Sequence, residues 1–383
     1  MLFPFDVMRP EQEEMIKDVE KAVSSGGYLL AHAPTGLGKT AAALAPALKV
    51  AIDKGYTVFF LTSRHTQHEI AVETLKLIKE KHKVNFTAVD IVGKKNMCAR
   101  PEADGFIGKQ FHEYCRSLRE NDDCEQYLNF RKNSELTPSS KNVLNFIRSL
   151  PVHTQEVVDS AKRERVCPYE VAAHASKEAS VIIADYYTIF NPSIRESFFK
   201  RNGKSLDRSI IIVDEGHNLP GRMREMLTER LTDFVLSRAL KEAEKWEESS
   251  IHEFLTAIQN GLHSMATEEK IVSKEQLLKL VQNYDLELVM ERMSVVADSV
   301  READKQSFIG SVADFLSSWQ LGDEGFARIL SSRDTSRGKN ITLSYQCLDP
   351  SLEAKSVIEA AHSVIMMSGT LTPLFMYKDL LGF

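Results

Sequence analysis

Eight consecutive residues near the N-terminus have the composition of a phosphate-binding loop. They are Ala33-Pro34-Thr35-Gly36-Leu37-Gly38-Lys39-Thr40, between an apolar run at 27–31 and an alanine-rich helical stretch at 41–52. Glycines let the backbone wrap closely around an anion, so that several N–H groups converge on the phosphates. In this pattern Lys39 reaches the β- and γ-phosphates, and the hydroxyl of Thr40 holds Mg²⁺. The sequence therefore predicts a nucleotide site lined by residues 34–40, and an ordinary strand-to-helix turn is the alternative.

An acid pair supplies the partner that such a loop requires. Asp214 and Glu215 directly follow the apolar run Ile210-Ile211-Ile212-Val213. In ATP-hydrolysing proteins of this type, the first acid binds Mg²⁺ through water and the second orients or deprotonates the attacking water. We therefore predict that Lys39, Asp214 and Glu215 form a catalytic group for ATP hydrolysis.

Two polar clusters could extend this site. Arg9 and Gln12 open a helix upstream of the loop and are spaced like side chains that read adenine, although surface Arg and Gln are common. Ser63 and Arg64 follow the apolar run at 56–61. Ligands in open α/β sheets bind beyond the carboxyl ends of strands, so Ser63 and Arg64 could contact a nucleic-acid backbone. A solvated loop is the alternative for the second cluster.

Four of the five cysteines lie in one irregular stretch between residues 93 and 174. They are Cys98, Cys115, Cys124 and Cys167, and no C-x₂-C pair occurs among them. Unrelated buried thiols, a Cys₄ zinc site and a [4Fe–4S] cluster all fit four cysteines, and the spacing alone does not choose between the metals. Tyr169, two residues after the last of them, could either stack on an unpaired base or pack in the core.

Composition limits the broader class of protein. The chain has 383 residues, of which 43% are hydrophobic and 27% charged, as in ordinary globular proteins. The net charge of −6 gives no support for nucleic-acid binding by bulk charge, so any such surface must be local. No apolar run reaches about 18 residues and no signal peptide is recognisable. These features, with an odd number of cysteines, predict a cytoplasmic protein without membrane contact, or a nuclear one if the organism is eukaryotic.

Several segments resemble motifs of one helicase family. Asp214-Glu215-Gly216-His217 is similar to the DEAH-type box of superfamily 2 helicases, with glycine where alanine is usual. The segments 93–98 and 166–169, which flank the first and last cysteines, resemble the XPD family of DNA repair helicases, as do 184–187 and 367–374. The resemblance covers nearly the whole chain in motif order.

This resemblance implies an ATP-dependent 5′-to-3′ helicase that moves on single-stranded DNA in nucleotide excision repair, with DNA repair proteins among its partners. It implies that the four cysteines hold a [4Fe–4S] cluster. It adds His217 to the ATP-binding residues. The DNA-binding residues that we expect are Ser63, Arg64, Tyr169, Tyr186, Ser368 and Thr370.

The expected fold is α/β, with one RecA-like P-loop domain and two insertions. Apolar runs at 27–31, 56–61, 87–91, 181–184, 210–213 and 363–367 predict a parallel sheet flanked by helices. The motor domain would comprise 1–88, 175–220 and 341–383, the cluster domain 89–174, and an α-helical arch 221–340. The arch carries 16 basic and 21 acidic residues, which favours a guide over a phosphate-binding surface.

The resemblance also implies a second motor domain, for which no segment of this sequence is a candidate. We therefore expect the N-terminal portion of a helicase that is inactive by itself. Two alternatives remain: a fragment that binds nucleotide and single-stranded DNA without turnover, and another P-loop NTPase with a zinc-binding insert.

Overall fold

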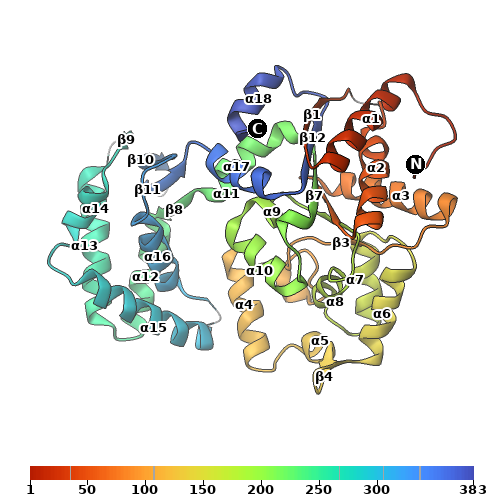
Figure 1. Ribbon diagram of the computed structural model, residues 1–383. Helices are drawn as coiled ribbons and strands as arrows, with labels where there is room; N and C mark the ends of the chain where they lie inside the picture. Colours follow the sequence, from red (N-terminus) through yellow and green to blue (C-terminus); the bar gives the residue numbers. More distant parts are fainter. Residues whose placement is uncertain (35, 107, 267, 305, 336–337) are drawn as a thin grey trace. The chain divides into compact units, whose positions relative to one another are not determined.

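The computed structural model describes residues 1–34, 36–106, 108–266, 268–304, 306–335 and 338–383. The chain divides into two compact units (Figure 1). The first unit contains Met1–Phe106, Asn121–Met223 and Pro350–Phe383, and the second contains Ile107–Glu120 and Arg224–Asp349. Residues 341–349, which the sequence-based boundaries assign to the motor domain, thus lie in the second unit. A separate cluster domain at 89–174 stays a prediction.

A six-stranded parallel sheet forms the centre of the first unit. Its strand order is β1-β12-β7-β2-β6-β3, and every neighbouring pair is parallel. The four inner strands are buried along their whole length, as expected for a sheet covered on both faces. Each strand coincides with a predicted apolar run: β1 (Tyr28–His32), β2 (Thr57–Leu61), β3 (Ala88–Asp90), β6 (Val181–Ala184), β7 (Ser209–Asp214) and β12 (Ser363–Ser368).

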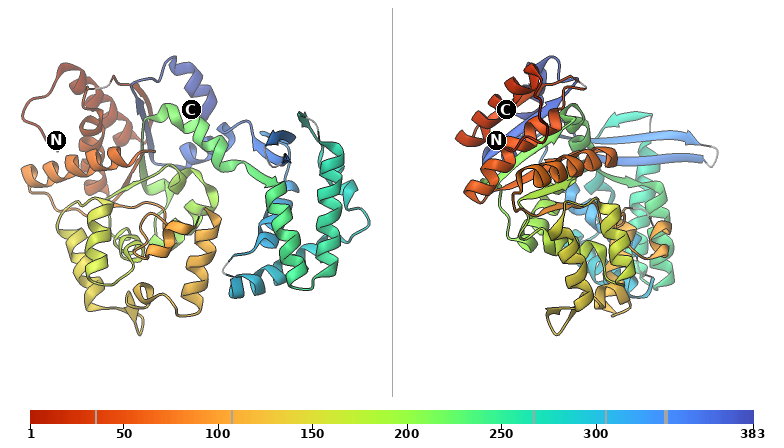
Figure 2. Two further views of the ribbon diagram at one scale, coloured as in Figure 1. Left: turned by 180° about the vertical axis from the view of Figure 1, so that it is seen from behind. Right: turned by 90° about the vertical axis from the view of Figure 1, so that its right-hand side faces the viewer.

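Alternate residues of β2 show how the two faces of this sheet are covered. Phe60 joins a core cluster that includes Leu44 of α2 (Lys39–Lys54) and Leu75 of α3 (His65–His82). Its neighbour Phe59 contacts the rings of Phe198 and Phe199, with ring centroids 6.4 and 5.7 Å away. Successive side chains of a strand point to opposite faces, so helices from different parts of the chain cover the two sides. Figure 2 shows this layering from two further directions.

The remaining elements of the first unit are helices and one small hairpin. The helices are α1 (Pro10–Ser25), α2 (Lys39–Lys54), α3 (His65–His82), α5 (Glu125–Leu128), α6 (Pro138–Ser149), α7 (Thr154–Arg163), α8 (Pro168–Ala175), α9 (Tyr187–Phe190), α10 (Pro192–Asn202), α17 (Ser351–Ala360) and α18 (Leu374–Leu381). Three short 3₁₀ helices are η1 (Pro101–Gly105), η2 (Leu206–Arg208) and η3 (Gly216–Asn218). The hairpin consists of β4 (Arg131–Lys132) and β5 (Glu135–Leu136). Helix α11 (Leu219–Leu227) crosses the boundary between the units.

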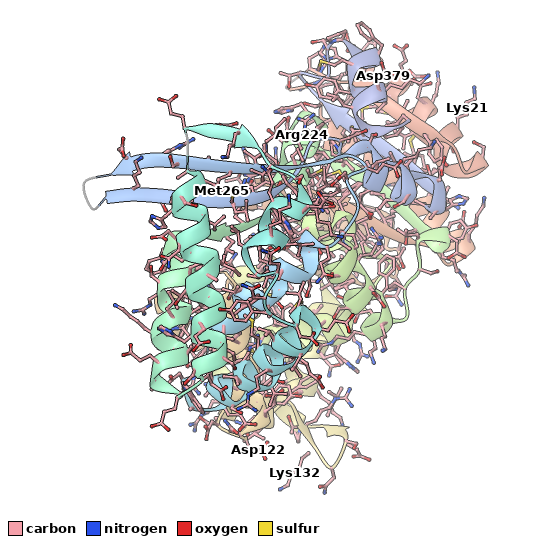
Figure 3. The ribbon with its side chains drawn as sticks, turned by 90° about the vertical axis from the view of Figure 1, so that its left-hand side faces the viewer. Lys21, Asp122, Lys132, Arg224, Met265 and Asp379 are labelled. Atoms are coloured by element: carbon pink, nitrogen blue, oxygen red, sulfur yellow. The ribbon has the colours of Figure 1, made fainter. Side chains whose placement is uncertain are left out.

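The second unit combines helices with a four-stranded antiparallel sheet. Its helices are α4 (Lys109–Glu120), α12 (Asp233–Lys245), α13 (Ser249–Met265), α14 (Lys274–Leu280), α15 (Leu286–Asp304) and α16 (Phe308–Trp319). Its strands lie in the order β8-β11-β10-β9, with bounds β8 (Glu229–Thr232), β9 (Glu269–Ile271), β10 (Phe326–Thr335) and β11 (Gly338–Cys347). The β10–β11 hairpin extends past its short neighbours (Figure 3).

This sheet corrects the expectation that residues 221–340 are purely helical. Leu330, Ile341, Leu343 and Tyr345 of the hairpin belong to the core of the second unit, whereas Thr342 is only half-buried. A helical stripe could not bury such an alternating set. Among the described residues, every helix is too short or too polar to cross a membrane.

Candidate nucleotide and nucleic-acid site

The loop between β1 and α2 has a backbone suited to a phosphate cradle. Gly36 and Gly38 have positive φ angles, 88° and 84°, which glycine adopts without strain. Gly38 also leaves room for the side-chain amide of Gln12, with which a Cβ at this position would collide. The next two residues, Lys39 and Thr40, begin α2, whose N-terminal N–H groups favour an anion. Of the predicted nucleotide residues, only Thr35 lies outside the described residues.

Lys39 joins this loop to the acid pair. Its ammonium forms an ion pair with Glu215 and lies 3.3 Å from Oδ1 of Asp214. The Lys39 side chain is only 14% exposed, so water screens these contacts weakly. The three residues that we expected to act together on the nucleotide therefore lie at one site, beyond the carboxyl ends of β1 and β7.

The backbone at the acid pair is held by a buried tyrosine. Glu215 has a positive φ of 50°, a conformation that residues other than glycine rarely adopt. The hydroxyl of Tyr186 donates to the carbonyl oxygens of Asp214 and Glu215, at 2.5 and 3.0 Å. Because Tyr186 is 1% exposed, its ring is not available to a base, and our expectation of a DNA contact at this residue is not supported. The structure gives it a supporting position under the acids instead.

The two acids have pKa values shifted in opposite directions. Burial raises the pKa of Asp214, although the charge of Lys39 opposes this. Burial also raises the pKa of Glu215, but hydrogen bonds from Lys39 and Ser368 and the charge of Lys39 outweigh it, so the net shift is downward. Glu215 is therefore ionised near neutral pH and can accept a proton or a hydrogen bond from water.

The glycine that departs from the DEAH pattern has a structural reason. A Cβ at Gly216 would collide with Cγ of Met366, which lies on β12 beside the acid pair. Most of the space that the alanine methyl group of a DEAH box would need is thus filled by a side chain from a strand 150 residues later. Sequence reasoning noted the glycine but missed Met366, because only the pairing of β12 with β7 brings the two together.

A hydroxyl at the end of β12 connects the box to the next motif. Ser368 Oγ donates to Glu215 Oε2 at 3.1 Å and accepts from Nδ1 of His217 at 2.7 Å. It also accepts from the backbone N–H of Thr370 at 3.2 Å. Ser368 and Thr370 were expected at DNA, and the structure places Ser368 in direct contact with the acid that would act on water. A displacement of the 368–370 turn would therefore change the hydrogen bond that Glu215 accepts from Ser368.

Arg9 and Gln12 lie beside the phosphate loop. The Arg9 guanidinium donates to the carbonyl oxygen of Gly36, and the Arg9 backbone N–H donates to Gln12 Oε1 at 3.0 Å. Gln12 is buried against Gly38. The two residues that we predicted from their spacing are thus brought to the nucleotide site, while their contact with adenine stays a prediction.

The other expected DNA contacts differ in exposure. Arg64 is exposed at the start of α3, and Ser63 before it is half-buried. Tyr169 is also half-buried, with Lys94 Nζ 5.2 Å and Arg201 Cζ 5.6 Å from its ring centre. Two cations therefore already lie close to the ring on which we expected a base to stack. Base contact at Tyr169 stays a prediction.

The four cysteines of the predicted cluster are half-buried, and the described residues contain no disulfide. Cys98, Cys124 and Cys167 belong to the first unit, and Cys115 lies on α4 in the second. Cys124 and Cys167 precede the first turns of α5 and α8, and the Cys167 N–H donates to the Gln126 carbonyl at 2.8 Å. Among the described residues, no group of three or more His, Cys, Asp or Glu side chains is placed to hold a metal ion.

Comparisons with known proteins agree with the fold and with the motif order. A DEAD/DEAH box helicase family model matches residues 9–107, and a DEAD_2 model matches residues 60–236. Relatives include the general transcription and DNA repair factor IIH helicase subunit XPD/RAD3 of Saccharomyces cerevisiae and the XPD subunit of Schizosaccharomyces pombe. They are 22% and 24% identical to this chain. Each match spans the whole of this chain and 60% of the length of the relative. The chain thus spans about three fifths of the curated relatives that it matches.

Solved structures show the same fold. One described as XPD_Helicase superposes with a TM-score of 0.70 at 21% identity, over 99% of this chain and 61% of the other. Another, described as Truncated XPD, has a TM-score of 0.63 at 21% identity and covers 97% of both chains. The sheet order, the phosphate loop and the acid pair together form a RecA-like domain, and a DEAD/DEAH box helicase model matches its N-terminal part. In sequence and in fold the chain is similar to helicases of the XPD type.

Proposed function

We propose that this chain is part of an ATP-dependent DNA helicase that moves 5′ to 3′ on single-stranded DNA. The observation that carries the proposal is the contact of Lys39 with both Asp214 and Glu215 at the carboxyl edge of a parallel sheet. The names of the relatives, which are helicase subunits of a transcription and DNA repair factor, support DNA as the substrate. They also support DNA repair as the process and DNA repair proteins as partners, and we propose nucleotide excision repair as the form of repair because the sequence motifs resemble those of repair helicases.

The residues at the site suggest how ATP would be hydrolysed. ATP would bind with its phosphates at the turn of residues 36–40, and Lys39 would move from the acids to the phosphates. Thr40 and Asp214 would hold Mg²⁺, which neutralises phosphate charge when bound. Glu215, kept ionised by its lowered pKa, would accept a hydrogen bond from the attacking water. Because Ser368 contacts Glu215, this change would alter the position of the turn at 368–370.

We further propose that turnover requires a second motor domain. Charge stabilisation at the γ-phosphate by an arginine finger is worth roughly 10³–10⁵ in rate in NTPases. In motors of this class the finger comes from the second domain. This chain spans only about three fifths of its relatives, which supports the idea that the finger lies outside these residues. Residues 1–383 alone would then bind ATP and single-stranded DNA but hydrolyse almost no ATP.

Two substitutions test the roles within the site. Lys39→Ala should weaken ATP binding, because it removes a positive charge from the triphosphate. Glu215→Gln should preserve binding but abolish hydrolysis in a preparation that contains both motor domains, since an amide cannot accept a proton from water. Lys49→Ala, an exposed lysine further along α2, is the matched control and should change neither quantity. An equal loss of binding in Lys39→Ala and Glu215→Gln would contradict the assignment.

The need for a second domain is tested by mixing. ATP hydrolysis is measured for residues 1–383 with and without single-stranded DNA, and then with the second motor domain of the same helicase added in trans. We expect almost no hydrolysis at first and a partial recovery on mixing. Strand separation by residues 1–383 alone would refute the division of labour. Strong hydrolysis without nucleic acid would favour another P-loop NTPase, and binding without hydrolysis even after mixing would favour a binding fragment.

We also propose that the four cysteines hold a [4Fe–4S] cluster. Four half-buried thiols outside disulfides suit this donor set, and two of them precede helix N-termini, which stabilise thiolates. Anaerobically purified protein should contain four iron and four sulfide per chain. Replacing any of the four by serine should remove the iron, whereas Cys347→Ser, at a buried thiol of the second unit, should not. One zinc per chain would overturn the iron assignment.

We place the protein in the cytoplasm, or in the nucleus of a eukaryote.

A further inference from the structure

A pocket in the first unit, separate from the phosphate loop, has the features of a second anion site. It is a cavity of about 220 Å³ lined by Tyr127, Leu128, Phe130, Arg131, Glu170, His174, Lys177 and Arg201. These residues come from α5, the β4–β5 hairpin, α8 and its end, and α10. In bulk water one molecule takes up about 30 Å³, so the cavity has room for roughly seven waters or for a phosphate group with part of a nucleoside. None of its residues takes part in the proposed helicase site.

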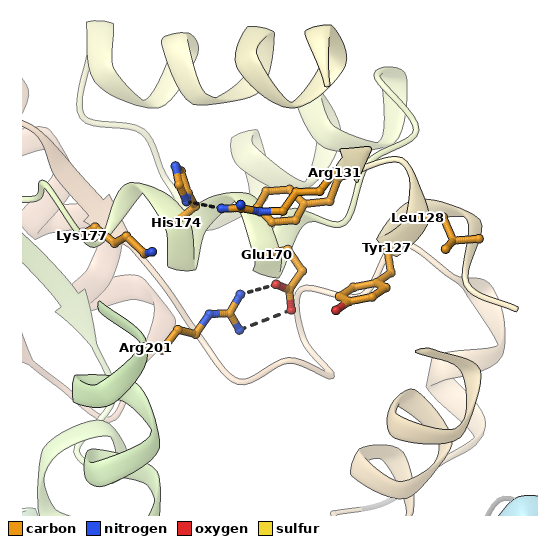
Figure 4. Close-up of a pocket in the computed structure, with 8 residues that line it drawn as sticks. Tyr127, Leu128, Arg131, Glu170, His174, Lys177 and Arg201 are labelled. Atoms are coloured by element: carbon orange, nitrogen blue, oxygen red, sulfur yellow. Dashed lines mark hydrogen bonds and ion pairs between the residues drawn. The ribbon is translucent and has the colours of Figure 1, made fainter. Parts of the chain in front are cut away.

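The charge in this pocket is positive after its internal pairs are counted. Arg201 and Glu170 form a double hydrogen bond, so they neutralise one another (Figure 4). Arg131 and Lys177 remain, and neither forms an ion pair with a carboxylate of the described residues. In the view of Figure 4 the Lys177 ammonium points toward the space between His174 and Arg201. Two positive charges without acidic partners match a ligand with a charge of about −2.

The Arg131 guanidinium is held in place before any ligand arrives. It donates to the Ser134 carbonyl at 2.9 Å and to Nδ1 of His174 at 3.3 Å, and it lies 5.3 Å from the centre of the Phe130 ring. Because arginine only donates, the His174 imidazole accepts at Nδ1 and is neutral in this arrangement. A planar guanidinium fixed in this way is the group that best recognises phosphate oxygens.

We propose that this pocket binds a phosphate monoester, with Arg131 and Lys177 contacting the phosphate and Tyr127 and Phe130 lining the space beside it. A monoester carries about −2 charge near neutral pH, against −1 for a phosphodiester inside a strand. A terminal phosphate can also enter a cavity end-on, whereas a continuous backbone would have to bend into it. The phosphate could belong to a free nucleotide or to the 5′ end of a nucleic-acid strand.

His174 provides a local reporter for this binding. Burial lowers the pKa of His174, and the charges of Arg131, Lys177 and Arg148 lower it further, while Glu178 opposes them. A bound dianion would offset these positive charges and raise that pKa. The His174 titration is then followed by NMR in protein labelled at histidine Cε1. The signal is assigned by its loss in His174→Gln, because the chain has 11 histidines.

The experiment adds inorganic phosphate and then AMP to residues 1–383. We expect the midpoint of the His174 titration to rise with either ligand. In Lys177→Gln the affinity should fall roughly tenfold, as expected for loss of one charge-assisted hydrogen bond. Lys177 makes no side-chain contact that the fold requires, so this variant should fold normally. Lys132→Gln, which lies on the β4–β5 hairpin next to Arg131 but outside the lining, removes the same charge as Lys177→Gln and should bind like the parent (Figure 3).

A second arm separates the two sources of phosphate. Single-stranded oligonucleotides with a 5′-phosphate and with a 5′-hydroxyl are compared with AMP in competition for the site. If the 5′-phosphorylated strand displaces AMP at concentrations well below that of AMP and the 5′-hydroxyl strand does not, the source is a strand end; if AMP binds as tightly as the phosphorylated strand or more tightly, the source is a free nucleotide. A His174 midpoint that stays constant with all of these ligands would overturn the proposal. An equal response in the Lys132→Gln and Lys177→Gln variants would overturn it as well, because the effect would then be one of general charge. Neither result depends on ATP hydrolysis.

Discussion

Replacing Gly216 by alanine restores the usual DEAH box, and the structure predicts that this change is harmful. By family pattern alone, the substitution should be neutral or stabilising, because an alanine restricts the unfolded chain and typically adds about 0.4–1 kcal/mol. In this fold the new methyl group would collide with Cγ of Met366, and the Met366 Sδ would lie 3.0 Å from it. Overpacking of a buried site costs about 1–3 kcal/mol. The structure therefore predicts that Gly216→Ala lowers the stability, whereas the family pattern predicts no change or a gain.

Thermal unfolding with Met366 variants measures this effect. For a unit of this size, 1 kcal/mol corresponds to roughly 2–4 °C, so the Gly216→Ala Tm should fall by roughly 2–12 °C. Met366→Ala removes the obstructing Cγ and Sδ at the cost of a cavity. In the double variant the two losses should be less than additive, which a double-mutant cycle detects as a coupling energy above about 0.5 kcal/mol. A Gly216→Ala protein as stable as the parent, or strictly additive losses, would refute the packing argument.

Three further predictions concern neighbouring groups. Tyr186→Phe should cost about 1–3 kcal/mol of stability because the buried carbonyl group of Asp214 loses the tyrosine hydroxyl as a donor, whereas Tyr377→Phe, at a partly exposed ring, should cost almost nothing in the same urea titration. Arg64→Ala should reduce the salt dependence of single-strand binding by roughly one unit of slope, while Tyr169→Ala should weaken binding by about 1–3 kcal/mol with little change in slope; two variants that bind like the parent would place DNA elsewhere. The pKa of Glu215 is lowered in the fold, so ionised Glu215 contributes to stability above its unfolded pKa, and this contribution is lost as the pH falls through its folded pKa. The free energy of unfolding, measured between about pH 5 and pH 3, should therefore fall with pH, and it should fall less in Lys39→Ala.

The parallel sheet of the first unit can be predicted from the sequence because the signals for its strands are local. All six strands of the parallel sheet are short apolar runs, and the loop and acid pair follow two of them directly. The exposure of Tyr186 could not be predicted in the same way. A tyrosine after a strand can point to solvent or into the core, and the deciding partners, the carbonyls of Asp214 and Glu215, belong to another strand end.

The sheet of the second unit was missed although its sequence carries a signal. Ile341, Leu343 and Tyr345 alternate with Thr342 and Ser344, which is the pattern of a half-buried strand. The expected boundary at residue 340 instead divides the hairpin, with β10 in the helical arch and residues 341–345 in the motor domain. The two short outer strands have no comparable signal, because β9 has three residues and β8 four, and their pairing with the hairpin depends on the tertiary fold.

The ion pairs of Lys39 have a consequence for the order in which ligands arrive. The lysine is the counterion of both Asp214 and Glu215. If it moves to a phosphate, two carboxylates of low exposure are left facing the added negative charge of the ligand. Only a ligand that brings its own cation keeps the local charge balanced during this exchange. We therefore expect that nucleotide without a divalent ion meets a barrier that the metal-bound form does not, so that the site would select the nucleotide and its metal as one unit.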